Sequence, residues 1–552
     1  MKIFCLNTNK YVAIKGGDSL NDIYSGIKEE LDFTPICAKV NNKTESLGYP
    51  VFGPKMVEFL PVTAPSAMRV YIRSLCMLLY RAATECFPGS RLVIEHSISK
   101  GSFCRLKNAG EVTPEKVAEI KAKMQELVAR DLPITRKERL RTDVIEIFRK
   151  QGLDDKVRLL ETVHDIYAVY HTLDGVSDCY YGAMVLSTGV LKVFDLLPYK
   201  DGMLLMGPDK ENPDVVTAPI KQEKMYSAFT EYLKFNNVIG IENVGELNSI
   251  IQAGKAPMLI NVAEALHEKK IAAIADDITE RYHKGGARVV LIAGPSSSGK
   301  TTTIKRLAIF LATNLLKPRM ISLDNYFVNR TDTPKDETGD YDYESLYALD
   351  LPLFNEHLNT LIKGGEVSLP TYDFTTGSRV YKGEKIHLDD NSILLIEGIH
   401  GLNPKLTEDI DEVMKYRVYV SALTTLSIDD HNWVPTTDNR LLRRIIRDAK
   451  YRGTSALETI RRWPSVRRGE EKWIFPYQEN ADAMFNSSLL FELSVLKEYG
   501  LEVLRGVPND APEYAEAYRL MRFLYYFAPL KPDAIPPTSL LREFLGGSTF
   551  EY

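Results

Sequence analysis

Residues 294–301 read GPSSSGKT and fit the pattern GxxxxGK[ST], which is typical of a phosphate-binding loop. An apolar run, ARVVLIAG, precedes the loop and a helical pattern, TTIKRLAIFLATNLL, follows it, so both contexts that the motif requires are present. In such a loop the backbone N–H groups and the positive end of the helix dipole surround a polyphosphate. The residues expected to bind the nucleotide are Gly294, Pro295, Ser296, Ser297, Ser298, Gly299, Lys300, Thr301 and Thr302.

Two side chains of this loop are expected to act on the phosphates directly. Lys300 would neutralise the β- and γ-phosphate oxygens and assist catalysis, and the Thr301 hydroxyl would ligate Mg²⁺. The expected cofactors are therefore ATP and Mg²⁺. The same loop occurs in kinases, ATPases and switch GTPases, so the rest of the chain must indicate which group, if any, receives the phosphate.

Two acidic residues follow apolar, strand-like runs: Asp324 in RMISLDNYF and Glu397 in NSILLIEGIHGL. In a parallel sheet the carboxyl ends of the strands converge on the ligand crevice, so both side chains can face the γ-phosphate. Asp324 is expected to take the proton from an attacking hydroxyl, and Glu397 to support Mg²⁺. The alternative is that each is an ordinary surface carboxylate at the end of a strand.

A basic stripe lies in DNRLLRRIIRDAKYRG, where Arg440, Arg443, Arg444 and Arg447 share one face of a predicted helix. A stripe of one charge sign without interleaved acids repels itself, and an anionic ligand would relieve that repulsion. We therefore expect this helix to form a lid that closes arginines over the phosphates and excludes water. The alternative is a charged helix face that water solvates.

A parallel α/β fold would bring the loop, the two acidic residues and the basic stripe together. From residue 286 to about 500, strands and helices alternate, which is the pattern of a parallel sheet with covering helices. Residues 226–285 are largely helical and are interpreted as a connector. The segment 501–552 contains a helix and Pro-rich turns, and its residues predict no chemistry.

The N-terminal half contains two further modules. Residues 1–61 contain two short strands that predict a hairpin, followed by a helix with Ser19 as its N-cap, in a ubiquitin-like order of elements. Residues 62–225 begin with a long helix that Pro88 ends, and a strand and a second helix follow. The stretch at 137–163 is also expected to be helical.

The composition limits the class of protein. A chain of 552 residues is too long for one core and predicts about three or four domains. The net charge of −5 argues against a protein that coats nucleic acid through an overall positive charge. The six cysteines are scattered without metal-site spacing and are expected to be reduced thiols. No signal peptide or apolar membrane span is evident, so a cytoplasmic location is expected.

Over about 286–490 the motifs together resemble the uridine kinase/phosphoribulokinase family of P-loop kinases. The resemblance rests on GPSSSGKTT, LDNYF, DYDYESLYALDLPLF, PTYDFTTGSR, IEGIHGL and RRIIRDAKYRG, in that order. It implies that Asp324 is the catalytic base and that Glu397 belongs to a Walker-B-like strand. It also implies acceptor-site roles for Asp342, Tyr372, Arg379 and Arg440, and nucleotide contacts for Arg443 and Arg447.

The chain departs from the family pattern at two positions. The base-reading histidine of the family falls on Gly377, which has no side chain to donate a hydrogen bond to a pyrimidine. A site built around such a bond discriminates strongly, so its loss leaves the identity of the acceptor open. The proline of the family's NFDxPxA segment is replaced by Glu344.

The N-terminal half resembles a different group of proteins. Residues 1–60 are similar to a TGS domain, and residues 68–205 to the second additional, editing-type domain of threonyl-tRNA synthetase. The histidines of that editing site fall on Arg73 and Met77, and its Cys-x-x-x-His falls on Cys179 and Ala183. Without imidazoles the site lacks a metal ligand set and a base, so no aminoacyl-tRNA hydrolysis is expected. RNA binding and a structural role remain as alternatives.

The leading interpretation is an ATP-dependent kinase that phosphorylates a hydroxyl of a nucleoside, such as uridine or cytidine, or of a related small acceptor. The alternatives are a nucleotide-switched RNA- or ribosome-binding protein and a P-loop kinase for a non-nucleoside sugar or alcohol. The predicted units are 1–61 (TGS-like), 62–225 (α+β, synthetase-like), 226–285 (connector), 286–500 (P-loop kinase) and 501–552 (tail).

Overall fold

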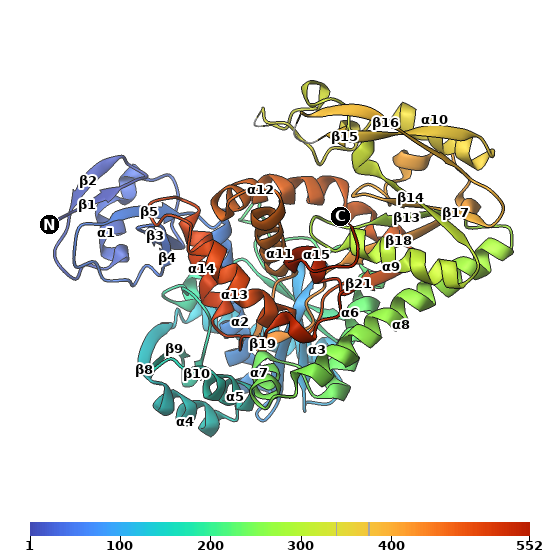
Figure 1. Cartoon of the computed structure of the whole chain (residues 1–552). Helices are drawn as coiled ribbons and strands as arrows, with labels where there is room; N and C mark the ends of the chain where they lie inside the picture. Colours follow the sequence, from blue (N-terminus) through green and yellow to red (C-terminus); the bar gives the residue numbers. More distant parts are fainter. Residues whose placement is uncertain (338, 374–375, 552) are drawn as a thin grey trace.

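A computed structural model describes residues 1–337, 339–373 and 376–551 (Figure 1). Phe374 and Thr375, which belong to the predicted acceptor motif PTYDFTTGSR, lie outside the described residues. Among the residues that the structure describes, every helix is too short or too polar to span a bilayer.

The C-terminal half contains the predicted parallel sheet, with the strand order β14-β17-β13-β18-β21. Each neighbouring pair of strands is parallel, and the central strand has the sequence VVLIA with every residue buried. A continuous apolar strand of this kind is expected where helices cover both faces of a sheet. The strands are β13 (Val289–Ala293), β14 (Lys317–Ser322), β17 (Ser392–Glu397), β18 (Lys415–Ser421) and β21 (Ala483–Asn486).

Helices cover both faces of this sheet. Alternate residues of β13 point to opposite faces, and each set packs against different helices. Val290 and Ile292 pack in one cluster with α8 (Ala256–His283) and α9 (Lys300–Thr313). Val289 and Leu291 pack in another cluster with α10 (Leu351–Ile362). Figure 1 shows α8 and α9 along the lower face of the sheet and α10 above it.

The first module is built on a mixed sheet with the order β2-β1-β5-β3-β4 and one helix, α1 (Leu20–Ile27). The predicted hairpin is confirmed as β1 paired antiparallel with β2. The predicted cap is also confirmed, because the Ser19 side chain accepts a hydrogen bond from the Asp22 amide. The strands are β1 (Lys2–Cys5), β2 (Lys10–Ala13), β3 (Cys37–Val40), β4 (Lys43–Glu45) and β5 (Met56–Leu60).

The next module contains two antiparallel sheets, β11-β12-β7-β6 and β10-β9-β8. The predicted long helix, strand and second helix are confirmed as α2 (Pro65–Cys86), β6 (Arg91–Ile98) and α3 (Pro114–Ala129). The remaining elements are β7 (Gly101–Lys107), β8 (Thr135–Leu140), α4 (Arg141–Gln151), α5 (Asp154–Thr162), β9 (Tyr167–Leu173), β10 (Val176–Asp178), β11 (Asp195–Tyr199) and β12 (Gly202–Met206).

The expectation of a helix from residue 137 is wrong for its first four residues. KERL is the end of β8, which pairs antiparallel with β9, and Lys137 lies opposite Tyr170. Every residue of β8 is exposed, so no pattern of burial marks it in the sequence. Pairing with a strand far along the chain therefore overrides the helical pattern that continues into α4.

The structure also differs from two of the predicted boundaries. The helix α6 (Glu223–Ile239) begins before residue 226, and α13 (Glu492–Leu504) crosses residue 500. The other helices of these regions are α7 (Val244–Gln252), α11 (Thr436–Tyr451), α12 (Ala456–Trp473), α14 (Tyr514–Leu524) and α15 (Arg542–Leu545).

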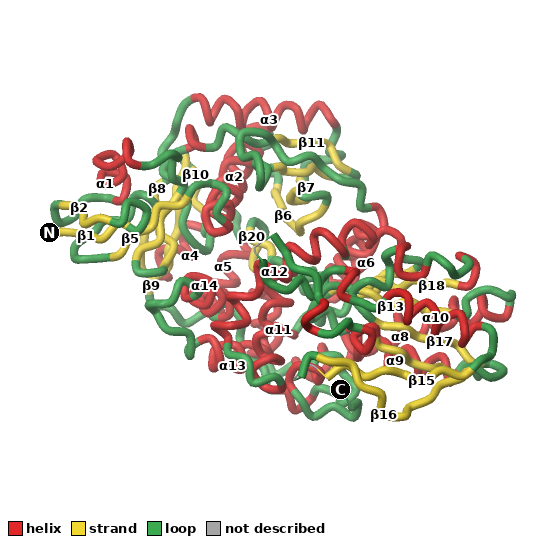
Figure 2. Tube along the Cα trace, turned by 90° about the horizontal axis from the view of Figure 1, so that it is seen from above, coloured by secondary structure: helices red, strands yellow, loops and turns green. Residues whose placement is uncertain are grey.

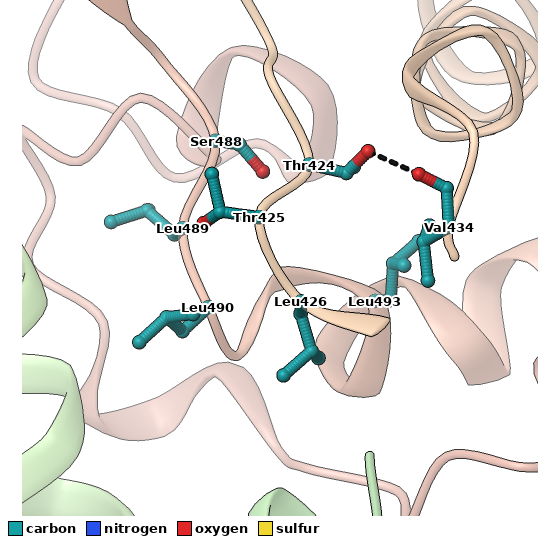
Figure 3. A pocket seen from close by; sticks show the side chains of 8 residues that line it. All are labelled: Thr424, Thr425, Leu426, Val434, Ser488, Leu489, Leu490 and Leu493. Atoms are coloured by element: carbon teal, nitrogen blue, oxygen red, sulfur yellow. Dashed lines mark hydrogen bonds between the residues drawn. The ribbon is translucent and has the colours of Figure 1, made fainter. Parts of the chain in front are cut away.

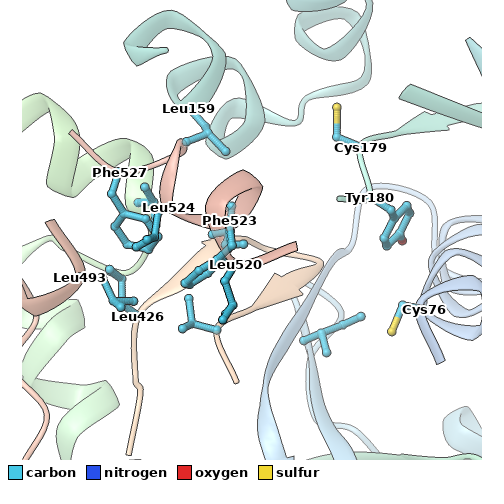
Figure 4. Packing of buried hydrophobic residues seen from close by; sticks show 14 of the residues in the cluster. Cys76, Leu159, Cys179, Tyr180, Leu426, Leu493, Leu520, Phe523, Leu524 and Phe527 are labelled. Atoms are coloured by element: carbon cyan, nitrogen blue, oxygen red, sulfur yellow. The ribbon is translucent and has the colours of Figure 1, made fainter. Parts of the chain in front are cut away.

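The two halves of the chain share one hydrophobic core. This core joins buried residues of α2 and α5 with residues of α11, α13 and α14, and Figure 4 shows Leu159 and Cys179 in the same packed region as Leu520 and Phe523. The helix α14 packs beside α12 and α13 and reaches β4 of the first module, and Figure 2 shows α11 and α12 leading towards the parallel sheet. The kinase-like half is therefore packed directly against the N-terminal half.

Candidate active site

The loop between β13 and α9 has the backbone shape of a phosphate cradle. Gly299 has φ 83° and Ser297 has φ 57°, both in the left-handed region. A Cβ on Gly294 would overlap the Val420 carbonyl, so only glycine fits at that point. The Lys300 side chain folds back along the loop, and its Nζ donates to the Gly294 and Pro295 carbonyls at 3.0 and 3.2 Å.

Thr301 and Glu397 lie together, as predicted for a metal site. The Thr301 hydroxyl donates to the Glu397 carboxylate, with distances of 3.1 and 3.3 Å to its two oxygens. Glu397 ends β17, where it pairs in register with Ile292 of β13 and Ser322 of β14. A hydroxyl and a carboxylate are the hard oxygen ligands that Mg²⁺ prefers, with nucleotide phosphates and water as the remaining ligands. The residues present therefore fit the expected cation.

Asp324 follows β14 in a short 3₁₀ turn, Leu323–Tyr326, and its amide donates to the Ser322 side chain at 3.3 Å. Asp324 is exposed to solvent. Desolvation by the surrounding protein raises its pKa, while the Lys300, Arg452 and Arg447 charges oppose that increase. Asp324 and Glu397 thus converge on Lys300 from neighbouring strand ends.

Carboxylates crowd around Lys300, and this changes their titration. Burial, followed by the charge of Asp324, raises the pKa of Glu397 to about 7. Burial and the charge of Glu470 raise the pKa of Glu344 to about 7 as well. Burial lowers the pKa of Lys300, whereas Glu397, Asp324, Glu543 and Glu344 favour its charged form. Carboxyl groups with a pKa near 7 beside a lysine are typical of a catalytic site.

Glu344 was noted in the sequence as a departure, and the structure places it inside the crevice. Its side chain lies against Gly469 of α12, where an added Cβ would overlap it. Its amide donates to the carboxylate of Asp342 at 3.2 Å. The predicted acceptor residue Asp342 therefore orients the segment that carries Glu344.

The other predicted acceptor residues lie on the hairpin of β15 (Glu366–Asp373) and β16 (Ser378–His387). Tyr372 and Arg379 face each other across the strand pair. The Arg379 side chain forms an ion pair with Asp350 at 2.8 Å. The Tyr372 amide donates to Asn325 at 3.4 Å, which joins the hairpin to the turn that carries Asp324.

The space beside Gly377 is filled by an arginine. Gly377 has φ 70°, and a Cβ there would lie 2.7 Å from Nε of Arg330. The Arg330 amide also donates to the Gly377 carbonyl at 2.8 Å. A guanidinium therefore lies at the position from which a family histidine would project.

The premise of an unopposed arginine stripe on α11 is wrong. Arg440 forms a buried ion pair with Glu470 of α12 at 2.5 Å, and Arg443 pairs with Glu492 of α13 at 2.7 Å. Arg444 and Arg447 pair with Asp448 of their own helix at 3.3 and 2.8 Å. Glu470 and Glu492 from other helices, which spacing along α11 could not reveal, and Asp448 of α11 itself thus relieve the repulsion. Nucleotide or acceptor contacts by these arginines stay predictions.

The same arginines hold the phosphate loop. Arg440 and Arg443 donate to the carbonyls of Ser296 and Ser297 at 3.3 and 3.4 Å. Arg444 donates to the Ser296 hydroxyl at 2.7 Å. The stripe therefore supports the loop on the side of α11, whatever it does when a nucleotide is bound.

Two carboxylates bind donors of the loop, and sequence reasoning missed both. The Ser296 amide donates to Glu470 at 3.1 Å. The Thr302 hydroxyl and amide donate to Glu543 of α15 at 2.7 and 3.3 Å. Glu470 and Glu543 are about 170 and 240 residues further along the chain, and no motif marks either of them.

A small cavity lies apart from this crevice. It has a volume of about 20 Å³, room for about one water molecule, and none of the predicted site residues lines it. Figure 3 shows its walls, with the Thr424 hydroxyl donating to the Val434 carbonyl. The lining residues are Thr424, Thr425, Leu426, Val434, Ser488, Leu489, Leu490 and Leu493.

In the N-terminal half, two of the four positions that correspond to the editing site, Arg73 and Ala183, contact each other. The Arg73 side chain donates to the Ala183 carbonyl at 2.7 Å and lies against Gly182. Met77 is buried, and the Cys179 thiol donates to the Val169 carbonyl at 3.2 Å. Among the described residues, no group of three or more His, Cys, Asp or Glu side chains is arranged to hold a metal ion. Packing of apolar and cationic side chains fills this region.

Known proteins similar to this chain match the segment that contains the candidate active site. A family model described as "Phosphoribulokinase / Uridine kinase family" matches residues 289–489. A uridine kinase of Lactobacillus helveticus is 34% identical over 198 residues, which are 35% of this chain and 83% of that protein. The family match spans Lys300, Asp324, Glu397 and the arginines of α11.

Two further similarities are weaker. A threonine–tRNA ligase of Rubrobacter xylanophilus is 27% identical over 191 residues, which are 35% of this chain and 30% of the ligase. A solved structure described as a possible uridine kinase from Bacillus stearothermophilus covers 38% of this chain and 98% of that chain, with 19% identity and a TM-score of 0.25. A structural score this low carries no argument.

Proposed function

Because the chain belongs to the phosphoribulokinase/uridine kinase family, we propose that it transfers the γ-phosphoryl group of ATP to a hydroxyl of a nucleoside or a related sugar-bearing acceptor. The chain is a P-loop kinase that acts on a small substrate. The observation that carries the finer proposal is the convergence of Lys300, the Thr301–Glu397 pair and Asp324 at adjoining strand ends.

Each residue has a part in the proposed reaction. Asp324 takes the proton from the acceptor hydroxyl while the hydroxyl oxygen forms a bond to the γ-phosphorus. The bond between that phosphorus and the bridging oxygen breaks, and ADP leaves. Lys300 and the loop amides hold the phosphates in line. Bound Mg²⁺, held by Thr301 and Glu397, would neutralise charge on the phosphate oxygens.

A second candidate acceptor is a non-nucleoside sugar or alcohol, and one observation favours it. The Arg330 guanidinium beside Gly377 is a planar donor with a fixed positive charge, which suits an anionic or oxygen-rich group better than a neutral pyrimidine. The acceptor site of this chain therefore supports two substrate classes, which differ in the charge of the group that Arg330 would contact.

An RNA-controlled switch has less support. A switch needs no catalytic base, and Asp324 stands where a base is useful. The sequence similarity to a threonine–tRNA ligase supports a synthetase-like origin for part of the chain, which we propose is the segment 62–225. RNA binding by that segment is a separate proposal from the kinase reaction.

The test is a screen of nucleosides, sugar alcohols and sugar phosphates by coupled ADP release, with RNA as a parallel addition. The proposal expects a nucleoside or sugar to accelerate ADP release many-fold, and Asp324→Asn to abolish that acceleration. Acceleration by RNA alone, or full activity of Asp324→Asn, would contradict it.

A further inference from the structure

The C-terminal segment, residues 532–551, packs directly against the phosphate loop. Leu540 and Phe544 belong to the same buried cluster as Ile304 and Leu307 of α9. The Leu540 side chain covers Gly299, where an added Cβ would lie 2.7 Å from Cδ1. In Figure 1 the C-terminus lies beside α15 and α9, next to the parallel sheet.

This segment places one carboxylate on the loop. Glu543 Oε2 accepts hydrogen bonds from the Thr302 hydroxyl at 2.7 Å and from the Thr302 amide at 3.3 Å. Thr302 lies in the first turn of α9, where backbone N–H groups have no partner within the helix. In a P-loop these donors cradle the nucleotide phosphates. Glu543 therefore lies on donors that suit a phosphate oxygen.

A carboxylate and a phosphate cannot use the same donors at once, and their like charges repel at short range. We infer that Glu543 is a residue of the nucleotide site that competes with the nucleotide phosphates for Thr302. Its carboxylate must leave the first turn of α9 before a nucleotide binds fully. The inference concerns the affinity for ATP and ADP, and it holds for any acceptor.

The rest of the segment is anchored independently of Glu543. The Arg542 side chain donates to the Pro532 and Ile535 carbonyls at 3.0 and 2.7 Å. Lys450 donates to the Leu545 carbonyl, and Lys305 donates to the Glu551 carbonyl. Rotation of the Glu543 side chain thus releases Thr302 without detaching the segment. Removing the whole segment would instead expose Ile304 and Leu307 of α9, which pack against Leu540 and Phe544, so point variants are the sharper test.

The experiment is calorimetric titration of the full-length chain with ADP and Mg²⁺, comparing wild type with Glu543→Gln. The variant removes the competing charge, so its Kd for ADP should fall about tenfold, the size expected from weakening one charge-assisted interaction. Glu543→Asp keeps the charge but shortens the side chain, and it should also bind ADP more tightly. Glu551→Gln is the matched control, because this exposed residue contacts Lys305 through its carbonyl.

An unchanged or higher Kd in both Glu543 variants would overturn the inference, since Glu543 would then be neutral or would itself help to bind the nucleotide. Tighter binding in Glu551→Gln would also overturn it, because the effect would be one of general charge. Failure of the acceptor screen leaves this titration intact. Absence of ADP binding in wild type and in every variant would overturn the nucleotide site itself.

Discussion

The crevice at the end of the parallel sheet and a buried cluster between the two halves of the chain use the same kinds of charged side chain with opposite results. In the buried cluster, Lys156 lies 2.8 Å from Asp178 and 2.7 Å from Asp429. The three side chains are at most 1% exposed, and Asp178 also contacts His431 at 2.7 Å. The positive charges keep the pKa of Asp178 well below its usual range despite burial.

In the crevice, burial and neighbouring carboxylates raise the pKa of Glu344 and Glu397 more than Lys300 and Arg444 lower it. Glu344 and Glu397 both have a pKa of about 7, and the pKa of Asp324 is also raised above its ordinary value. Asp178, which contacts two cationic partners, thus stays charged and fixes a structure, whereas Glu344 and Glu397, which are buried near other carboxylates, retain the capacity to exchange protons. Lys156 joins segments of the two halves, and Lys300 is the lysine that we propose serves the reaction.

The largest effect is expected for Asp324→Asn, which should lower kcat by about 10³-fold or more, as for removal of a general base. The Kd for ATP should change little, because the loop and Lys300 are untouched. Stopped assays of phosphorylated acceptor and a nucleotide titration would measure the two quantities. Normal turnover by this variant would remove Asp324 from the mechanism.

Lys156→Met tests the opposite side of the comparison. It leaves Asp178 and Asp429 buried without their cation, so the free energy of unfolding should fall by about 3–5 kcal/mol. Chemical denaturation measures this loss. The exposed control Lys150→Met should stay within about 0.5 kcal/mol of wild type. Equal stabilities for the two variants would show that the buried cluster is not structural.

Glu397→Gln sharpens the distinction between the carboxylates of the crevice. It removes the carboxylate that we propose as a Mg²⁺ ligand, so the Mg²⁺ concentration for half-maximal activity should rise about 10-fold or more. Titration of activity with Mg²⁺ at saturating ATP measures this shift. An unchanged Mg²⁺ requirement would mean that Thr301 and the phosphates suffice.

The smallest effect concerns pH. Glu344 has a folded pKa of about 7, above its ordinary value of 4.5, so the folded chain binds a proton that the unfolded chain releases between these values. The contribution of this proton to the free energy of unfolding is fully present below pH 4.5 and is lost as the pH rises through about 7. Glu344→Gln should therefore reduce the fall in unfolding free energy between pH 5 and 8, by an amount on the order of 1 kcal/mol. Identical pH profiles would contradict the raised pKa.

The parts of the site that follow from local sequence were predictable. The loop, Asp324 and Glu397 each directly follow an apolar strand, and parallel pairing brings strand ends together without further information. The cap at Ser19 and the hairpin of β1 and β2 were likewise local.

Contacts between distant segments could not be predicted in this way. The partners of Arg440 and Arg443 come from α12 and α13, and Glu543 reaches Thr302 from the C-terminal segment. The prediction of a helix at the end of β8 was wrong for the same reason. The exposed residues of β8 show no alternation of apolar and polar side chains, and the strand forms by pairing with β9. Electrostatic balance in a folded protein is a property of three-dimensional neighbours, which periodicity along one helix does not report.

The common core of α2, α5, α11, α13 and α14 has a thermodynamic consequence. Segments that share their apolar contacts lose them together, so this core should melt in a single cooperative transition that spans both halves of the chain. A nucleotide that binds only the folded form would then raise the melting temperature of strands far from the phosphate loop, including β9, by mass action alone.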